Sequence, residues 1–219
     1  MSGKTVAGTK GAGRYGLLLL VLIATYLLAA FSGGRVVEGV QVGMVAVVLV
    51  LALRTSPLPG WWPVLVGAVT AVGSAVAIWV SVSGTMTGLG ATELWKALLL
   101  LVTAVLIVRR VLAMPAVTIQ SIFGALSAYL VSGLMFASIY AAIAHLGHSP
   151  FFADGQPGSS QTFQYFSFTT LTTLGYGDFT AAGNGGRAVA VLEAMTGQVY
   201  LATLVARLVA AYRAPERHQ

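Results

Sequence analysis

The sequence predicts an all-α integral membrane protein, and three observations support this. Of its 219 residues, 57% are hydrophobic and only 8% are charged, and the mean hydropathy is +0.86. Such a chain has too little polar surface to coat a soluble domain. The apolar residues also gather into runs close to the roughly 20 residues that a helix needs to cross a bilayer. Runs such as "MVAVVLVLALR" are apolar on every side, whereas the strands of a membrane barrel alternate apolar and polar residues.

Six segments are predicted to span the membrane as helices, and they are 15–32, 38–54, 61–83, 94–113, 118–147 and 187–212. The first follows a basic stretch and therefore also resembles a signal peptide. Its apolar run of about 17 residues exceeds the 7–15 residues of a signal core, so we expect it to be retained. The connections between the first four spans are short and rich in Pro, Gly and Ser, as in "TSPLPGWWP" and "SGTMTGLGAT". The chain is thus expected to divide into a tail (1–14), a four-helix bundle (15–113) and a two-span module (114–219).

The basic residues predict the orientation of these spans. By the excess of Lys and Arg in cytoplasmic loops, one side of the membrane receives nine of the 12 basic residues: Lys4, Lys10, Arg14, Arg54, Arg109, Arg110, Arg207, Arg213 and Arg217. Only Arg35, Lys96 and Arg187 fall on the other side. We therefore expect a multi-pass protein of the cell membrane with both termini in the cytoplasm. This topology, together with contacts to membrane lipid, accounts for the net charge of +6, and no nucleic-acid partner is expected.

The long connection 148–186 between the last two spans is the most informative part of the chain. Within it, "SQTFQYFSFTTLTT" has room only for a short helix, with Ser159 or Ser160 as the N-cap. About 12 residues at ~1.5 Å each cover less than 20 Å, whereas the hydrocarbon core is ~30 Å thick. We therefore expect a segment that enters the membrane and returns. Irregular backbone at that depth is tolerated only where protein shields it or where it lines a watery cavity.

The sequence "TLGYGD" (173–178) follows this short helix and has glycines at alternate positions. Glycine adopts left-handed backbone conformations that other residues resist. Such a backbone is able to turn successive carbonyl oxygens toward one axis. Four copies around a symmetry axis would then form rings of oxygens that replace the water around a monovalent cation.

This pattern resembles the potassium-channel family, whose selectivity filter is T-x-G-Y-G-D between a pore helix and the last span. The resemblance implies a homotetramer that conducts K⁺, with no cofactor and no enzymatic activity. It implies that K⁺ is bound by the hydroxyl and carbonyl of Thr173 and by the carbonyls of Leu174, Gly175 and Tyr176. It also places Gly177 at the turn that completes the filter and Asp178 at the outer mouth. Leu174 stands where the family most often has valine, and we expect the change to alter packing behind the filter.

Further residues are expected to support this segment. The candidates on the short helix are Tyr165, Phe166, Thr169, Thr170 and Thr172, with Phe163 and Phe168 completing the aromatic set. In the last span, Glu193 is an acid inside the membrane, which by default indicates function. We expect it to form a hydrogen bond to the back of the short helix, at Thr169 or Thr170.

Two more residues of the last span have structural interpretations. Gly197 stands where the family often has a hinge glycine, and close helix packing explains a small residue equally well. Arg207, near the inner end, is expected to extend its side chain to the membrane surface.

The first four spans complete the six-span layout of voltage-gated channels, which makes this bundle resemble a voltage sensor. Its fourth span nevertheless lacks a sensor's repeated arginines and offers only Lys96, Arg109 and Arg110. Steep voltage gating uses about 3–4 charges per subunit that cross the field. We therefore expect a scaffold and a channel without strong voltage gating.

Two other functions remain open at this stage. A non-selective cation channel would use nearly the same architecture, and a non-conducting assembly subunit is the alternative of a different class. The sequence contains no paired nucleophile and base, no phosphate-binding loop and no cysteine, so an enzyme is not expected. His145 and His148 lack a third ligand, and we do not expect a metal site there.

Overall fold

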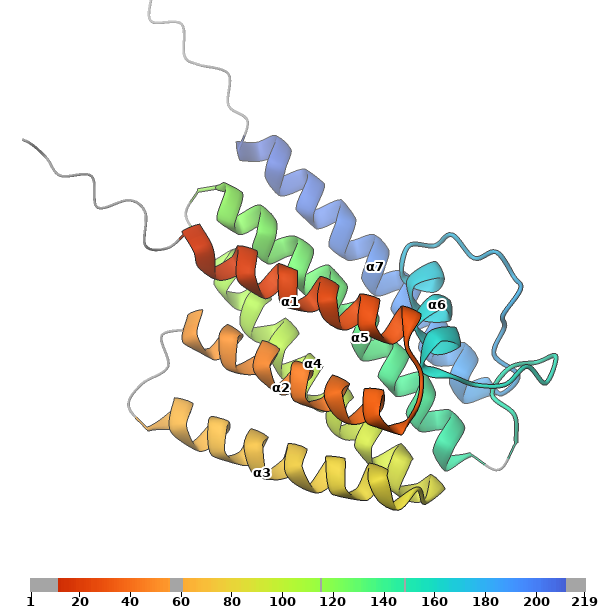
Figure 1. Ribbon diagram of the computed structural model, residues 1–219. Coiled ribbons are helices and arrows are strands. Elements are labelled where there is room, and N and C mark those ends of the chain that lie inside the picture. Colours follow the sequence, from red (N-terminus) through yellow and green to blue (C-terminus); the bar gives the residue numbers. More distant parts are fainter. Residues whose placement is uncertain (1–11, 56–60, 115, 148, 212–219) are drawn as a thin grey trace, which may run out of the picture.

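The computed structural model describes residues 12–55, 61–114, 116–147 and 149–211, and these residues form seven α-helices (Figure 1). In chain order the helices are α1 (Ala12–Phe31), α2 (Arg35–Thr55), α3 (Trp62–Ser83), α4 (Met86–Leu112), α5 (Ile119–Leu146), α6 (Ser160–Leu171) and α7 (Asn184–Ala211). Extended backbone in these described ranges pairs only at the isolated bridge between Phe152 and Ala181. The prediction of an all-helical protein is confirmed.

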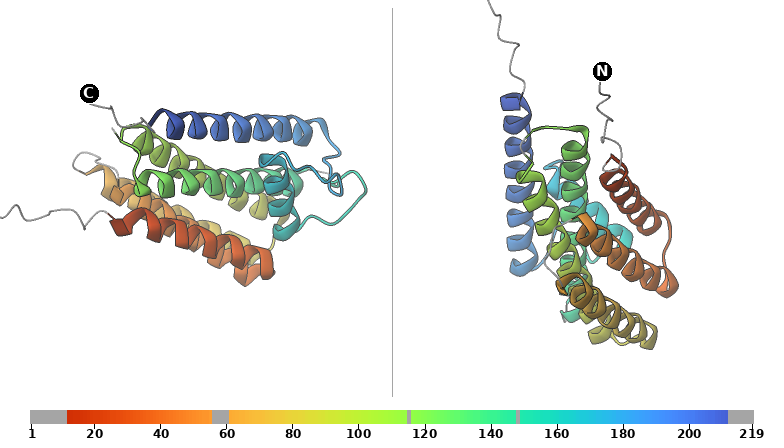
Figure 2. Two further views of the ribbon diagram at one scale, coloured as in Figure 1. Left: turned by 90° about the horizontal axis from the view of Figure 1, so that it is seen from above. Right: turned by 90° about the vertical axis from the view of Figure 1, so that its left-hand side faces the viewer.

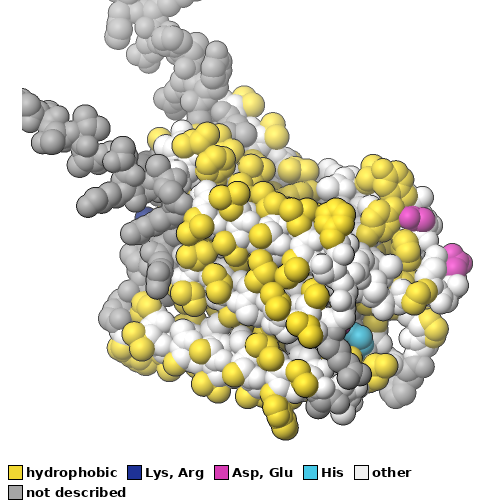
Figure 3. Space-filling model, viewed as in Figure 1, with side chains coloured by type: hydrophobic (Ala, Val, Ile, Leu, Met, Phe, Trp, Pro, Cys, Tyr) yellow, Lys and Arg dark blue, Asp and Glu magenta, His cyan; other side chains and the backbone are white. Residues whose placement is uncertain are grey.

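Five of the described helices, α2, α3, α4, α5 and α7, are long and apolar enough to cross a bilayer. The apolar segment of α1, Tyr15–Phe31, is shorter, so the first of the six predicted spans, 15–32, is not confirmed by length and composition. Hydrophobic side chains cover much of the face shown in Figure 3. On that face the acidic side chains appear at the end of the molecule that carries the loops around α6. The chain is therefore a helical membrane protein.

The start of the fourth span was predicted wrongly. Helix α4 begins at Met86, not at residue 94, and the glycine-rich stretch before Glu93 is helical. The Thr85 side chain caps this helix by accepting a hydrogen bond from the Gly88 N–H at 3.2 Å. Gly84 ends α3 in the left-handed conformation, with φ 71°, so the turn between the two helices is tight. A composition rich in glycine predicts a loop, but a good N-cap and the packing of α4 outweigh that local cost.

Helix α5 lies at the centre of the molecule, and α1, α4, α6 and α7 all contact it. The connection from α4 to α5 is short, so the two helices run antiparallel and pack along their length. The main core lies between α1, α2, α4 and α5, and fully buried members of it are Leu18, Leu22, Val48, Leu100, Ile107 and Val131. In both views of Figure 2, α7 runs along one edge of the bundle. Helices α1 and α4 thus pack directly against α5.

A second buried cluster holds α6 in place. It joins aromatic side chains of α5, α6 and the loop before α6, namely Phe136, Tyr140, Phe151, Phe152, Phe163 and Phe166. The rings of Phe152 and Phe163 stack at 5.4 Å between centroids, and Tyr140 meets Phe166 edge to face at 4.9 Å. Aromatic pairs at these distances contribute attraction beyond the area that they bury. The cluster fixes α6 against the end of α5 (Figure 1).

Candidate functional site

Helix α6 is a short helix with a well-defined start. Ser159 is the N-cap, because its hydroxyl accepts from the Thr162 N–H at 3.2 Å and the Thr162 hydroxyl accepts from the Ser159 N–H at 2.7 Å. This reciprocal pair is a capping box. The helix has 12 residues, so at ~1.5 Å per residue it is too short to cross a bilayer. The predicted short helix and its N-cap at Ser159 are confirmed.

The backbone dihedral angle φ alternates in sign after α6. Thr173, Gly175 and Gly177 have φ values of 57°, 52° and 81°, which are left-handed conformations. Leu174 and Tyr176 between them do not have positive φ. The sequence predicted left-handed backbone at the two glycines, and this is confirmed. It did not predict the same at Thr173, the one described residue other than glycine with positive φ, where a β-branched side chain makes the conformation costly.

Hydrogen bonds from the backbone amides hold this segment against the end of α6. The Thr173 N–H donates to the Thr170 carbonyl at 2.9 Å, and the Leu174 and Gly175 N–H groups both donate to the Thr169 carbonyl, at 2.8 and 3.1 Å. The carbonyl oxygens of residues 173–177 accept no hydrogen bond from any part of the chain that the structure describes. The amide N–H groups of residues 173–175 thus bond to the end of α6, whereas the carbonyl oxygens of residues 173–177 have no donor among the described residues. Thr169 and Thr170 contribute through their carbonyl oxygens.

The aromatic ring of Tyr176 rests on Tyr165 of α6. The two rings are parallel within 5°, with centroids 6.4 Å apart. The Tyr165 hydroxyl donates to Asp178 Oδ2 at 2.8 Å, and this hydrogen bond raises the pKa of Tyr165. Gln156 donates from Nε2 to the Asp178 carbonyl at 2.8 Å, a contact that the sequence did not indicate. Tyr165 and Gln156 therefore fix the position of Asp178 through hydrogen bonds.

The other predicted support residues lie farther from this segment. Phe163 and Phe166 belong to the buried aromatic cluster, and Phe168 meets Tyr26 of α1 edge to face at 5.0 Å. The Thr172 hydroxyl donates to the Phe168 carbonyl at 2.7 Å, within its own helix end. Of the four aromatic candidates, only Tyr165 stacks on Tyr176 within the part of the chain that the structure describes. The other three rings anchor α6 to the rest of the protein.

Gln198 of α7 is a further residue at the site that sequence reasoning missed. Its Nε2 donates to Thr173 Oγ1 at 2.8 Å. The signal available in the sequence was a polar amide in the middle of an apolar span, directly after Gly197. The contact links α7 to the first residue of the left-handed segment.

Gly197 lies where α7 packs closely against the end of α6. A Cβ atom built on Gly197 would lie 2.0 Å from the Leu171 carbonyl oxygen, closer than real Cβ contacts ever come. The packing interpretation of this glycine therefore has a direct geometric basis. The hinge interpretation stays a prediction.

Glu193 is completely buried where α5, α6 and α7 meet. Its Oε2 accepts from the Tyr140 hydroxyl at 2.6 Å, and its Oε1 lies 2.5 Å from Ser167 Oγ. The expected contact with the back of α6 exists, but the predicted partner was wrong: it is Ser167 and not Thr169 or Thr170. The Thr169 hydroxyl instead donates to the Tyr165 carbonyl at 2.9 Å, within its own helix.

Arg207 has a different role from the one predicted. Its guanidinium donates from Nη1 to the Val111 carbonyl and from Nη2 to the Met114 carbonyl, both at 2.7 Å. Carbonyls at the end of a helix lack partners within the helix, and cations are favoured there. Arg207 therefore caps α4 from α7 instead of extending to the membrane surface.

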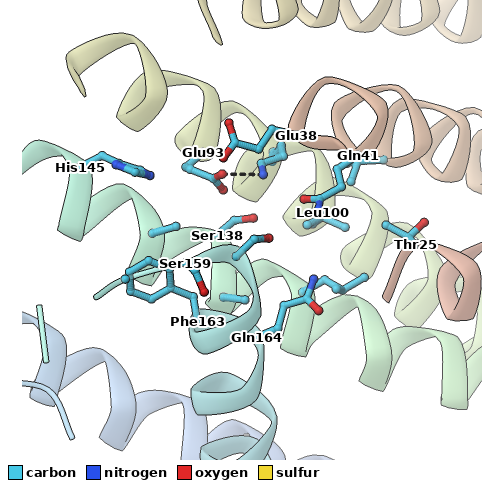
Figure 4. Close-up of a pocket in the computed structure, with 17 residues that line it drawn as sticks. Thr25, Glu38, Gln41, Glu93, Leu100, Ser138, His145, Ser159, Phe163 and Gln164 are labelled. Carbon is cyan, nitrogen blue, oxygen red and sulfur yellow. Dashed lines mark ion pairs between the residues drawn. The ribbon is translucent and has the colours of Figure 1, made fainter. Parts of the chain in front are cut away.

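A polar cavity of about 70 Å³ lies between the bundle and the start of α6 (Figure 4). Lys96 pairs with Glu93 at 2.6 Å, and both side chains are largely buried. The buried Gln41 Nε2 and Gln164 Oε1 have no hydrogen-bond partner among the described residues, and both residues line the cavity. A space of this size holds about two water molecules, which would satisfy such groups.

The described residues contain no group of three or more His, Asp or Glu side chains that could hold a metal ion. His145 lines the polar cavity, whereas His148 of the predicted histidine pair lies outside the described residues.

The region around this site also matches a known family. Residues 125–214, which run from α5 to beyond the end of α7, match the family model described as Ion channel. This part of the chain is similar to an ion channel domain. The match agrees with the resemblance to potassium channels, and the family is one of channels and not of enzymes. The chain matches no curated protein and no solved structure. The matched region contains α6, the left-handed segment and the buried Glu193.

Proposed function

We propose that four copies of this chain form a potassium-selective channel. In this proposal K⁺ passes along the carbonyl oxygens of Thr173, Leu174, Gly175 and Tyr176, joined at the inner end by the Thr173 hydroxyl. Gly177 completes the filter, and Asp178 lies at its outer mouth. The ion channel domain supports a channel function in general, and the geometry of residues 173–177 supports the choice of ion.

The observation that carries the proposal is the alternating backbone with its unused carbonyls. A backbone whose residues alternate between positive and negative φ is able to turn successive carbonyls to the same side. The amides of residues 173–175 are already satisfied by Thr169 and Thr170, whereas the carbonyls of residues 173–177 have no protein donor in the described ranges. Buried backbone acceptors in folded proteins are almost always paired. Residues 173–177 are exposed in the single chain, and once neighbouring copies enclosed them their carbonyl oxygens would need another partner. A dehydrated cation is the partner that such rings bind.

The direction of α6 supports a cation as the ligand. The helix ends at Leu171, two residues before the left-handed segment begins. The C-terminal end of a helix carries partial negative charge, equivalent to roughly half an electron. This end adjoins the proposed ion path and would favour a positive ion there.

Assembly into a tetramer is supported by surfaces that one chain leaves uncovered. The side chains of Leu174 and Tyr176 are 55% and 68% exposed although they belong to the candidate filter. Helix α7 also exposes a set of large apolar residues, which are Val191, Leu192, Met195, Val199, Leu201, Val205 and Val209. A single chain supplies only one side of an oxygen ring. Packing of neighbouring copies on α7 would both cover these residues and close the ring.

The fourth helix supports a channel without strong voltage gating. Its outer charge, Lys96, is buried and paired with Glu93 one turn away. Its other described basic residues, Arg109 and Arg110, lie in the last turn. We propose that α1–α4 act as a scaffold in the cell membrane, with both termini in the cytoplasm.

Ion flux in liposomes tests the proposal. Purified protein should pass K⁺ down a gradient and should pass Na⁺ poorly, and Gly177→Asp should abolish the flux or its selectivity. Gly155→Asp is the matched control, because Gly155 also has a left-handed φ of 68° and open space around it, yet it lies in the loop before α6. Equal Na⁺ and K⁺ flux would indicate the non-selective channel. Assembled protein without any flux would indicate the non-conducting subunit.

A further inference from the structure

Five oxygen atoms form a chain of short contacts at the junction of α5, α6 and α7, with the Glu193 carboxyl group contributing two of them. The Tyr140 hydroxyl lies 2.6 Å from Glu193 Oε2, Glu193 Oε1 lies 2.5 Å from Ser167 Oγ, and Ser167 Oγ lies 2.7 Å from the Gly133 carbonyl oxygen. Tyr140, Ser167 and Glu193 are all completely buried. Each contact is short enough to require a hydrogen atom between the two oxygens.

Counting the hydrogen atoms locates one of them on Glu193. A carbonyl oxygen only accepts, so the contact at Gly133 uses the single hydrogen of the Ser167 hydroxyl. That hydroxyl has no second hydrogen for the contact with Glu193 Oε1. The hydrogen in this contact must therefore come from Glu193, and the Tyr140 hydroxyl supplies the one directed at Oε2.

We infer that Glu193 is a neutral carboxylic acid and acts as a positioning residue for α6. It accepts from Tyr140 of α5 and donates to Ser167 of α6, which donates back to Gly133 of α5. Every polar atom in this relay has a partner of the right kind. The relay joins all three helices through one side chain.

The surroundings of Glu193 agree with a neutral side chain. The one ion pair within the described ranges is Glu93 with Lys96, so no described cation pairs with Glu193. A buried carboxylate without a positive partner is strongly disfavoured, whereas a neutral acid with both oxygens bonded is not. A relay of this kind retains its strength inside the protein, because the local dielectric is low.

The relay bears on the proposed channel through the position of Ser167. Ser167 lies on α6 just before Thr169 and Thr170, whose carbonyls hold the amides of residues 173–175. Fixing the rotation of α6 therefore fixes those carbonyls. This consequence rests on the proposed function, whereas the protonation of Glu193 does not.

Infrared spectroscopy tests the protonation directly in the full-length protein. The chain has only six acidic side chains, so the C=O stretching band of a protonated carboxyl is readily assigned. At neutral pH we expect this band in the parent protein and its loss in Glu193→Gln. Ser167→Ala should retain the band and shift it to higher frequency, because the acid loses its acceptor. A parent spectrum without the band, or a band that neither variant alters, would overturn the inference.

Substitutions separate this role from mere packing. Glu193→Gln retains an acceptor for Tyr140 and gains an N–H donor for Ser167, so it should assemble and conduct like the parent. Glu193→Leu has similar volume but no polar atoms, and it should lose the selective flux. If Glu193→Gln does not conduct and the parent protein lacks the protonated-carboxyl band, the negative charge of Glu193 is needed and the inference is overturned. If the band is present in the parent and lost in Glu193→Gln, but neither the parent nor any variant conducts K⁺, the channel proposal fails and the protonation of Glu193 stands.

Discussion

Replacing Gly197 with alanine tests the close approach of α7 to the end of α6. The added Cβ would lie 2.0 Å from the Leu171 carbonyl oxygen and 3.0 Å from its carbon, whereas ordinary contact begins at 3.4 Å. The clash is with backbone, which has no rotamer to change, and this carbonyl also accepts from the Tyr129 hydroxyl at 3.2 Å. The two helices would have to separate by about 1.4 Å. Overpacking of this kind costs ~1–3 kcal/mol, partly offset by a helix-propensity gain of up to ~1 kcal/mol.

The expected result is a free energy of unfolding lower by about 1–2 kcal/mol, or a Tm lower by about 2–8 °C for a domain of this size. Thermal unfolding in detergent, followed by circular dichroism, measures it. Gly43→Ala in α2 is the matched control, because a Cβ there has nothing within 4 Å and should leave the Tm unchanged or raise it slightly. The reasoning is refuted if Gly197→Ala leaves the Tm as Gly43→Ala does. An unchanged Tm with altered channel opening would favour the hinge.

Three further outcomes are expected. Arg207→Met removes two charge-assisted hydrogen bonds that cap α4 and should lower the free energy of unfolding by about 2–4 kcal/mol; an unchanged Tm would show that the cap contributes nothing. Lys96→Met should lower the free energy of unfolding by ~3–5 kcal/mol, because it leaves Glu93 buried and unpaired. Adding Glu93→Leu to this variant should recover most of that free energy. If the two substitutions instead lower it additively, the ion pair does not contribute to stability. The hydrogen bond to Asp178 raises the pKa of Tyr165. The stabilisation of the folded protein by this hydrogen bond should therefore be complete below the ordinary tyrosine pKa and should be lost as the pH rises through the raised value. Tyrosinate absorbance, with Tyr165→Phe as the reference, should show Tyr165 ionising at lower pH in Asp178→Asn, and an unmoved titration would contradict this.

The helical membrane architecture and the short helix before "TLGYGD" followed from the sequence, because they depend on local properties. Apolar runs and an N-cap serine act within a few residues of each other, and so do glycines that permit left-handed backbone. The start of α4 was missed for the same reason, since its glycines indicated a loop while the Thr85 cap and packing against α3 formed a helix. The left-handed Thr173 was missed because its conformation depends on bonds from its neighbours back to α6.

By itself, the sequence determined that this protein is a helical membrane protein, and it singled out residues 173–178 as the segment for which we propose ion binding. Only the tertiary structure decided that Glu193 meets Ser167, that Gln198 meets Thr173 and that Arg207 caps α4. These partners lie on different helices, and their contacts depend on how each helix is rotated and shifted against the next. In a span that is apolar on nearly all sides, the sequence pattern carries little information about that rotation. Packing of whole helices selects it, and the polar contacts follow.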